Sequence, residues 1–269
     1  MKKLSLDPAQ WATLNSLFRL VSAEDRDQIH SIRTIDLLDP QICTELLDYL
    51  TPVIHSPSRR VTASLLSKRI AFLSTASSLY AMSAYNQGLN MSLQNCYLEF
   101  GYENRLWQSH MPLTDLSLSA PENGQRESWR RMLIRQLFAD NLSRLWQVLV
   151  EVAKVPLSIL WENTAVRVYS LYERRMSDLG CVSLQNRVDK DFHYLINEAP
   201  AELFGTSENP LHKYFWPRQQ VTHSNKSVRF RKTCCYYYRA SEPKEYCSTC
   251  PLIRPKRPRK PKNKEIITV

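Results

Sequence analysis

Glycine is scarce in this chain, with five in 269 residues and none before Gly88. Phosphate-binding loops and dinucleotide-binding turns depend on closely spaced glycines, and neither G-x-G-x-x-G nor the Walker A pattern occurs. No apolar run approaches the roughly 18–20 residues that a membrane-spanning helix needs. The six histidines show no ligand spacing such as H-E-x-x-H, and no catalytic triad is visible. These absences argue against nucleotide binding by a known loop and predict a soluble protein.

Helix signals are frequent over the first 225 residues. Asp7-Pro8 and Asp39-Pro40 each combine an N-cap residue with a proline at the first helical position, which is typical of a helix start. Apolar residues recur at helical spacing behind both pairs. The same spacing predicts further helices over residues 61–84, over residues 127–154, and from Pro156 to near Gly180.

The pattern changes between residues 90 and 118. Residues 92–100 alternate imperfectly between polar and apolar side chains, and the stretch after them is turn-like with short extended pieces. This pattern predicts a small hairpin. We therefore expect an α+β fold that is helix-dominated, with a small β-hairpin or sheet.

Two polar groups within the predicted helices have both a functional and a structural interpretation. Arg130, Arg131 and Arg135 could form a surface that attracts anions, although a solvated helix face is the default. Glu162 and Asn163 follow Trp161 in a strongly apolar helix and could face a cleft. A solvent-facing turn of that helix is the simpler expectation.

Cysteine is concentrated near the C-terminal end. Four of the seven cysteines lie within seventeen residues, as Cys234-Cys235 and then Cys247-Ser-Thr-Cys250. Buried structural cysteines behave as small apolar residues and are scattered, so this grouping indicates a metal site rather than packing. The three scattered cysteines, which we expect in the core, are Cys43, Cys96 and Cys181.

Four chemistries compete for the grouped cysteines. A structural zinc favours paired C-x2-C knuckles, and only the second pair has that spacing. A [2Fe–2S] cluster needs two ligands on each iron and tolerates more varied spacings. Two disulfides need an oxidising compartment, whereas residues 1–11 show no secretory signal. A redox dithiol at Cys247 and Cys250 lacks a surrounding thioredoxin-like pattern. The spacing leaves the cluster and zinc as the main alternatives.

The net charge of +10 is unevenly distributed. Residues 1–225 are neutral, residues 226–250 carry six basic and two acidic side chains, and residues 251–269 carry seven basic and one acidic. The last stretch also holds four prolines, so we expect an extended tail. Such a tail could contact anionic lipid or nucleic acid, steer an anionic substrate or an acidic electron donor, or have no role.

The residues around the cysteines resemble a known family. Arg231-Lys-Thr-Cys-Cys-Tyr-Tyr-Tyr-Arg239 and Tyr246-Cys-Ser-Thr-Cys-Pro-Leu252 are similar to the C-terminal signature of the FhuF-type siderophore ferric reductases. The match covers about twenty residues. Eleven residues separate Cys235 from Cys247, one more than is usual in the family. A loop absorbs such an insertion at little cost.

This resemblance implies that Cys234, Cys235, Cys247 and Cys250 bind a [2Fe–2S] cluster. It also implies a mixed, mainly helical architecture, like the C-terminal part of the siderophore synthetases. The implied activity is one-electron reduction of siderophore-bound Fe(III) to Fe(II), which releases iron in the cytoplasm. The alternative is a zinc-stabilised binding module whose basic tail contacts nucleic acid or anionic membrane.

The implied organisation has three parts. Residues 1–225 form a helix-rich core that docks the siderophore, residues 226–252 form the iron–sulfur-binding segment, and residues 253–269 form a basic, proline-rich tail. The expected partners are a ferric siderophore and an electron donor. Specific nucleic acid is not expected, and the tail is a candidate for weak contact with the inner membrane surface. We therefore expect a cytoplasmic protein. A peripheral position at the inner membrane is the alternative localisation.

Overall fold

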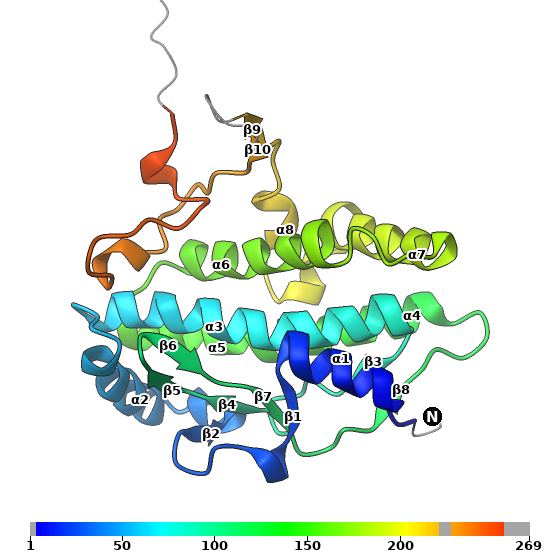
Figure 1. Cartoon of the computed structure of the whole chain (residues 1–269), viewed down its shortest axis with the longest axis horizontal. Coiled ribbons are helices and arrows are strands. Elements are labelled where there is room, and N and C mark those ends of the chain that lie inside the picture. Colours follow the sequence, from blue (N-terminus) through cyan, green and yellow to red (C-terminus); the bar gives the residue numbers. More distant parts are fainter. Residues whose placement is uncertain (1–3, 221–226, 256–269) are drawn as a thin grey trace, which may run out of the picture.

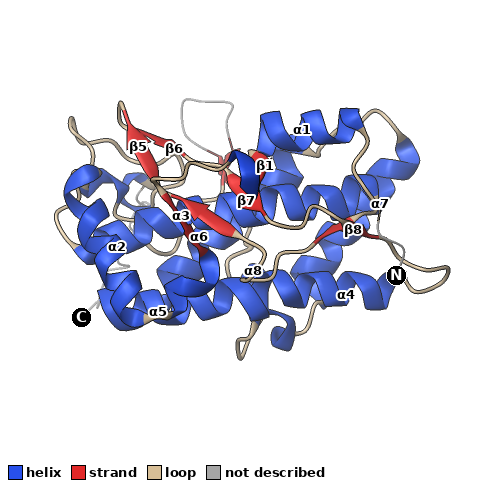
Figure 2. Cartoon of the chain, turned by 90° about the horizontal axis from the view of Figure 1, so that it is seen from below, coloured by secondary structure: helices blue, strands red, loops and turns tan. Residues whose placement is uncertain are grey.

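The computed structural model describes residues 4–220 and 227–255 of the chain. Helices form most of this structure, and the long helix α3 runs through its middle (Figure 1). Helices α6, α7 and α8 lie on one side of α3 with strands β9 and β10, and strands β1 to β8 lie on the other side with α1 and α2 (Figures 1 and 2). The helices are α1 (Pro8–Phe18), α2 (Pro40–Val53), α3 (Arg59–Tyr80), α4 (Arg126–Leu137), α5 (Ser143–Ala153), α6 (Leu157–Ser170), α7 (Val182–His193) and α8 (Pro210–Lys213).

The strands are short and pair two by two. Strands β1 and β7 are parallel, with Leu20 opposite Met111. The pairs β2–β4, β3–β8, β5–β6 and β9–β10 are antiparallel, and Tyr102 faces Trp107 across β5 and β6. The bounds are β1 (Leu20–Ser22), β2 (Ser31–Arg33), β3 (Gly88–Leu89), β4 (Tyr97–Glu99), β5 (Gly101–Glu103), β6 (Leu106–Gln108), β7 (Met111–Leu113), β8 (Leu118–Ser119), β9 (Gln219–Gln220) and β10 (Ser227–Val228). The helix-dominated α+β fold with a small hairpin is therefore confirmed.

The predicted helix starts have the expected capping chemistry. The Asp7 carboxylate accepts a hydrogen bond from the Gln10 backbone N–H at 2.8 Å, and the Gln10 side chain accepts one from the Asp7 N–H at 3.3 Å. This is a capping box, which satisfies two backbone donors reciprocally. The Asp39 carboxylate accepts from the Gln41 N–H at 2.8 Å. The longer predicted helices continue through five-residue π-helical turns, such as Phe138–Leu142 between α4 and α5.

Helix α3 is buried on nearly all sides, which is unusual for a helix of mixed composition. Its buried positions include many small residues, among them Ser64, Ser67, Ala71 and Ser74. The distance between packed helices depends on side-chain size, so these residues allow α6 to lie closely along α3. The two helices together form the surface against which the C-terminal segment is placed.

Two expectations about individual residues are wrong. Cys43 and Cys96 are buried as expected, but Cys181 is exposed, because it occupies the N-cap position of α7. Arg130 was expected on a solvated face, yet its side chain is only 12% exposed and donates to the buried Asp191 at 3.0 Å. Periodicity could not reveal this partner, which lies sixty-one residues away.

The division into residues 1–225, 226–252 and 253–269 stays a prediction. Most of the basic tail, residues 256–269, lies outside the described residues. Among the helices that the structure describes, none is long and apolar enough to cross a lipid bilayer.

Candidate metal centre

The structure brings the four grouped cysteines together. Cys234 and Cys235 precede a short 3₁₀ turn, Tyr237–Arg239, and the loop that follows returns Cys247 and Cys250 to them. The segment lies across one end of α3 and α6 (Figure 1). The backbone N–H of Cys250 donates to the Cys247 carbonyl at 2.9 Å, which closes the second pair into a tight turn.

The four thiols are arranged as two pairs. The Sγ atoms of Cys235 and Cys247 are 3.7 Å apart, and the thiols of Cys234 and Cys250 contact each other. Two thiolates on one tetrahedral metal, with bonds of about 2.3 Å, would lie about 3.8 Å apart. Within the described residues, no three or more His, Cys, Asp or Glu side chains could hold a single metal ion. The two close thiol pairs match what a dinuclear group with two thiolates on each metal requires.

The surroundings favour thiolate character at Cys235. Its side chain is buried, and the hydrogen bond with Cys247 lowers the pKa of the Cys235 thiol to about 4, against the opposing effect of burial. The positive charges of Lys68 and Arg231 lower this pKa further. The same hydrogen bond, together with burial, raises the pKa of Cys247. Metal ligation requires thiolates, so the nearby cations assist it.

A buried glutamate holds the backbone just before the first cysteine pair. Glu162 of α6 is 1% exposed and accepts hydrogen bonds from the backbone N–H groups of Lys232 and Thr233, both at 2.7 Å. The Thr233 hydroxyl donates to the same carboxylate at 2.5 Å. The guanidinium of Arg231 lies 3.6 Å from this carboxylate. Hydrogen bonds to a charged group are the stronger ones, so Glu162 anchors the cysteine segment to the helical body.

A second anchor acts on the cysteine pair itself. The Ser64 hydroxyl of α3 donates to the backbone carbonyl of Cys235 at 2.9 Å. The Asn163 amide of α6 donates to the Ser64 carbonyl at 2.9 Å and to the Ser67 hydroxyl at 2.8 Å. Tyr236 then takes a positive φ of 63°, which is uncommon for an aromatic residue. This turn brings its N–H within 3.4 Å of the Cys234 Sγ.

The sequence pointed to these helix residues without identifying their role. The polar pair Glu162 and Asn163 was noticed, but the preferred interpretation, a solvent-facing turn, is wrong because both side chains are 1% exposed. Ser64 and Lys68 were missed altogether. The only available signal was polar residues at buried helical positions, and their partners lie up to 171 residues away.

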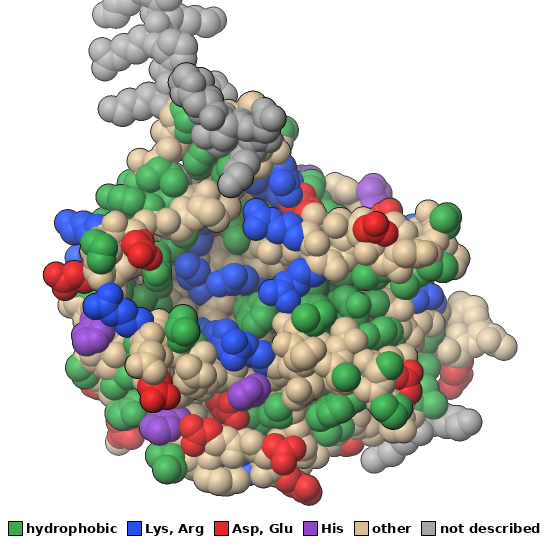
Figure 3. All heavy atoms as spheres, in the orientation of Figure 1, with side chains coloured by type: hydrophobic (Ala, Val, Ile, Leu, Met, Phe, Trp, Pro, Cys, Tyr) green, Lys and Arg blue, Asp and Glu red, His purple; other side chains and the backbone are tan. Residues whose placement is uncertain are grey.

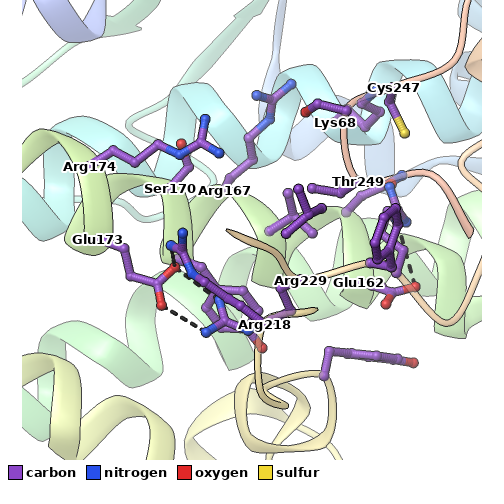
Figure 4. A pocket seen from close by; sticks show the side chains of 18 of the residues that line it. Lys68, Glu162, Arg167, Ser170, Glu173, Arg174, Arg218, Arg229, Cys247 and Thr249 are labelled. Atoms are coloured by element: carbon purple, nitrogen blue, oxygen red, sulfur yellow. Dashed lines mark hydrogen bonds and ion pairs between the residues drawn. The ribbon is translucent and has the colours of Figure 1, made fainter. Parts of the chain in front are cut away.

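A cavity of about 670 Å³ adjoins the cysteine segment (Figure 4). One wall is the face of α6 that carries Asn163, Arg167 and Ser170, and the opposite wall includes residues 227–231. Cys247 lines the end of the cavity near Lys68. Lys and Arg side chains gather in a hollow on this face of the molecule (Figure 3). The grouped thiols thus lie beside a basic cavity of ligand size.

Comparisons with known proteins agree with this geometry. Residues 64–221 match the family model described as ferric iron reductase FhuF-like transporter, and residues 231–252 match the model of the FhuF 2Fe-2S C-terminal domain. No curated protein matches the chain.

A solved structure, the aerobactin synthetase IucC from a hypervirulent pathotype of Klebsiella pneumoniae, is 13% identical with a TM-score of 0.45. The similarity covers 67% of this chain and 35% of the synthetase, so the chain matches about a third of that protein's length. The two family models together cover both the helical body and the cysteine segment, and the second favours the iron–sulfur interpretation over zinc. The chain therefore belongs to the FhuF-like ferric iron reductase family, and its C-terminal segment is the 2Fe–2S domain of that family.

Proposed function

We propose that the protein is a ferric-siderophore reductase that uses a [2Fe–2S] cluster held by Cys234, Cys235, Cys247 and Cys250. The observation that carries this proposal is the convergence of four thiols, as two close pairs, beside a basic cavity of ligand size. With this pairing, Cys235 and Cys247 would hold one iron, and Cys234 and Cys250 would hold the other.

The chemistry needs one electron and no proton transfer. When bound, a [2Fe–2S] cluster supplies one electron at a time at a low potential. A siderophore holds Fe(III) through hard oxygen donors that suit Fe(II) less well, so one added electron weakens the chelate and lets iron leave. The proposed reaction therefore assigns no general acid, base or nucleophile to the residues around the cavity.

The residues of this chain have positioning tasks in that reaction. Glu162 and Ser64 fix the backbone that carries the first cysteine pair. Lys68, with its Nζ 3.7 Å from the Cys235 Sγ, places a positive charge beside the ligand sulfur. The cavity gives a chelate a place to dock next to Cys247. A separate donor must return the electron, and we propose that the reaction takes place in the cytoplasm.

Anaerobic purification followed by a visible spectrum and by iron, sulfide and zinc assays tests the cofactor and its ligands. We expect a red-brown protein with about two irons and two sulfides. Serine at Cys234, Cys235, Cys247 or Cys250 should abolish the colour, whereas the control Cys181→Ser, at an exposed cysteine, should retain it. A colourless protein with one zinc would overturn the proposal and favour the zinc-stabilised binding module.

Activity is tested separately by single turnover. The chemically reduced protein is mixed with a ferric siderophore, and Fe(II) is trapped by a ferrous-specific dye while the cluster spectrum reports reoxidation. We expect the two signals to rise together, with one Fe(II) formed for each electron lost. Reoxidation without Fe(II), or no reoxidation by any ferric siderophore, would contradict the reductase function and leave only an iron–sulfur protein.

A further inference from the structure

The cavity beside the cysteines has an excess of positive charge that the described residues do not neutralise. Six basic and two acidic side chains line it. Glu173 accepts hydrogen bonds from Arg218 at 2.6 Å and from Arg229 at 2.8 Å, so these three groups form one cluster. The other acid, Glu162, is occupied by the cysteine segment. The lining cations without a carboxylate partner in the described part of the chain are Lys68, Arg167 and Arg174.

These three cations differ in what they contact. Lys68 lies against the Cys235 Sγ, so it is the counter-ion of the thiolates. Arg167 and Arg174 lie on the α6 side of the cavity, and Arg174 lies farther from Lys68 and Cys247 than Arg167 does (Figure 4). Residues 163, 167, 170 and 174 follow helical spacing and so lie on one face. Arg174 therefore lines the part of the cavity that extends away from the cysteines, and Arg167 lies between Arg174 and the thiols.

Arg167 is half-buried and has no carboxylate partner in the described part of the chain. Burial lowers the pKa of Arg167 and the positive charge of Arg231 lowers it further, whereas the negative charges of the Cys235 and Cys247 thiolates raise it. A buried cation is retained at a cost unless an opposite charge pairs with it. A guanidinium also presents several donors in a planar fork that matches carboxylate oxygens. The two guanidinium groups along one wall form a binding site for an anion with several oxygens.

The rest of the lining suits a small organic chelate. Val166, Tyr169, Tyr214 and Phe230 supply apolar surface, and Ser170 and Thr249 supply hydroxyl groups. A volume of about 670 Å³ falls within the range of roughly 300–1,000 Å³ that is usual for small-molecule sites.

We propose that this cavity binds an anionic ferric chelate, in which carboxylate or catecholate oxygens leave a net negative charge that Arg167 and Arg174 meet. This inference rests on the proposed reductase function and adds the substrate class and the residues that select it. A neutral or cationic chelate would leave both arginines unpaired and should bind more weakly. Because Cys247 is part of the same lining, the bound chelate lies next to a proposed ligand of the cluster.

Gallium(III) chelates test this inference, because gallium(III) resembles Fe(III) in size and charge but is not reduced. Calorimetry on the full-length, cluster-loaded protein compares the anionic gallium tris-catecholate with the cationic gallium complex of desferrioxamine. We expect the anionic probe to bind at least about tenfold more tightly, with an affinity that falls as salt is added. Equal affinities, or tighter binding of the cationic probe, would overturn the proposal.

Variants then locate the site. The double variant Arg167→Gln/Arg174→Gln should weaken binding of the anionic probe about tenfold or more. The single variant Arg174→Glu, at an exposed position, should also weaken it and carries little risk to folding. The charge-matched control Arg144→Gln/Lys190→Gln alters two exposed positions outside the cavity and should bind as the unaltered protein does.

The outcomes separate the two levels of inference. If both arginine variants bind the anionic probe with unchanged affinity, the proposed docking site is wrong. Reduction of a ferric chelate by the same variants would still support the reductase function. If the unaltered protein binds the anionic gallium probe through Arg167 and Arg174 but reduces no ferric chelate, the binding site stands and the reductase function fails. A retained visible spectrum in every variant shows that the cysteine segment is intact.

Discussion

The ε-ammonium of Lys68, on helix α3, lies 3.7 Å from the sulfur of Cys235, 167 residues later in the chain. The same ammonium lies 5.2 Å from the ring centre of Tyr237. A positive charge beside a ligand sulfur stabilises the more negative, reduced form of a cluster. This contact therefore links a residue of the helical body to the redox properties of the C-terminal segment.

Lys68→Met should make the cluster harder to reduce. Methionine keeps much of the side-chain length but removes the charge, so we expect the midpoint potential to fall by tens of millivolts, equivalent to about 1 kcal/mol for one electron. A redox titration followed by visible absorption measures this change. The control Lys190→Met removes an exposed lysine of α7 and should leave the potential unchanged. A potential that is unchanged or higher in Lys68→Met would contradict the assignment.

Glu162→Gln should loosen the cysteine segment without unfolding the helices. The amide is nearly the same size, but it replaces a carboxylate that accepts three hydrogen bonds. Losing charge-assisted hydrogen bonds costs about 1.5–3 kcal/mol each, so a cluster should be lost to an added iron chelator at least about tenfold faster. The decay of the visible absorption measures this rate. The control is Glu151→Gln, at an exposed position of α5, and equal half-times for the two variants would refute the anchoring role.

Asp191→Asn should destabilise the helical body. Asp191 is fully buried and binds Arg126 at 2.6 and 2.8 Å and Arg130 at 3.0 Å. Neutralising it leaves two arginines without their shared partner, and breaking a buried ion pair costs about 3 kcal/mol or more. Urea unfolding followed by circular dichroism measures the loss. Asp189→Asn, at an exposed position two residues earlier on α7, should change stability by less than about 0.5 kcal/mol.

Glu173 should make stability depend on pH in the acid range. Burial alone would raise the pKa of Glu173, but the hydrogen bonds and charges of Arg229 and Arg218 outweigh it and hold that pKa below the usual 4.5. The folded state therefore binds this proton less tightly than the unfolded chain does. Its stabilising contribution is complete above pH 4.5 and is lost as the pH falls through the lower, folded pKa.

Glu173→Gln removes the stabilising contribution of the ionised carboxylate at neutral pH. The variant has no carboxylate at this position to protonate, so this contribution no longer changes in acid. The stability difference between the unaltered protein and the variant should therefore be largest near pH 7 and shrink as the pH falls below 4.5. Urea titrations at several pH values measure it. A difference that stays constant with pH, or grows in acid, would show that the carboxylate is not stabilised by its arginines.

Deleting residues 254–269 should abolish any binding to anionic lipid vesicles. The deleted stretch contains all seven basic residues that follow Cys250, and basic residues near an anionic surface contribute about 1 kcal/mol each. Co-sedimentation with vesicles rich in phosphatidylserine measures the binding, and phosphatidylcholine vesicles serve as the control. Equal sedimentation before and after the deletion would remove the tail as a membrane contact.

The features that the sequence predicted well depend on residues close together in the chain. The caps at Asp7 and Asp39 involve partners two or three residues away, and helical spacing reveals amphipathic helices directly. The grouped cysteines were visible because their types and spacing differ from those of core residues. The helix-dominated α+β fold follows from these features, whereas the family and its 2Fe–2S domain were expected from the resemblance of residues 231–239 and 246–252 to the family signature.

The surroundings of the cysteines depended on long-range contacts and could not be predicted. Glu162 and Thr233 are 71 residues apart, and no periodic pattern within one helix records such a pair. Asn163 was misjudged for the same reason, since its partner Ser64 lies on another helix. Cys181 was misjudged because a thiol at a helix start and a thiol in a core look alike in sequence.

The anchoring of the cysteine segment has a consequence for the order of biosynthesis. The groups that receive the segment, Ser64 on α3 and Glu162 on α6, are translated before Thr233 and Cys235. Domains generally fold as units while the chain is being made, from the N-terminal side onward. The receiving surface can therefore form before the thiols leave the ribosome, so that the cysteine segment docks on helices that are already in place.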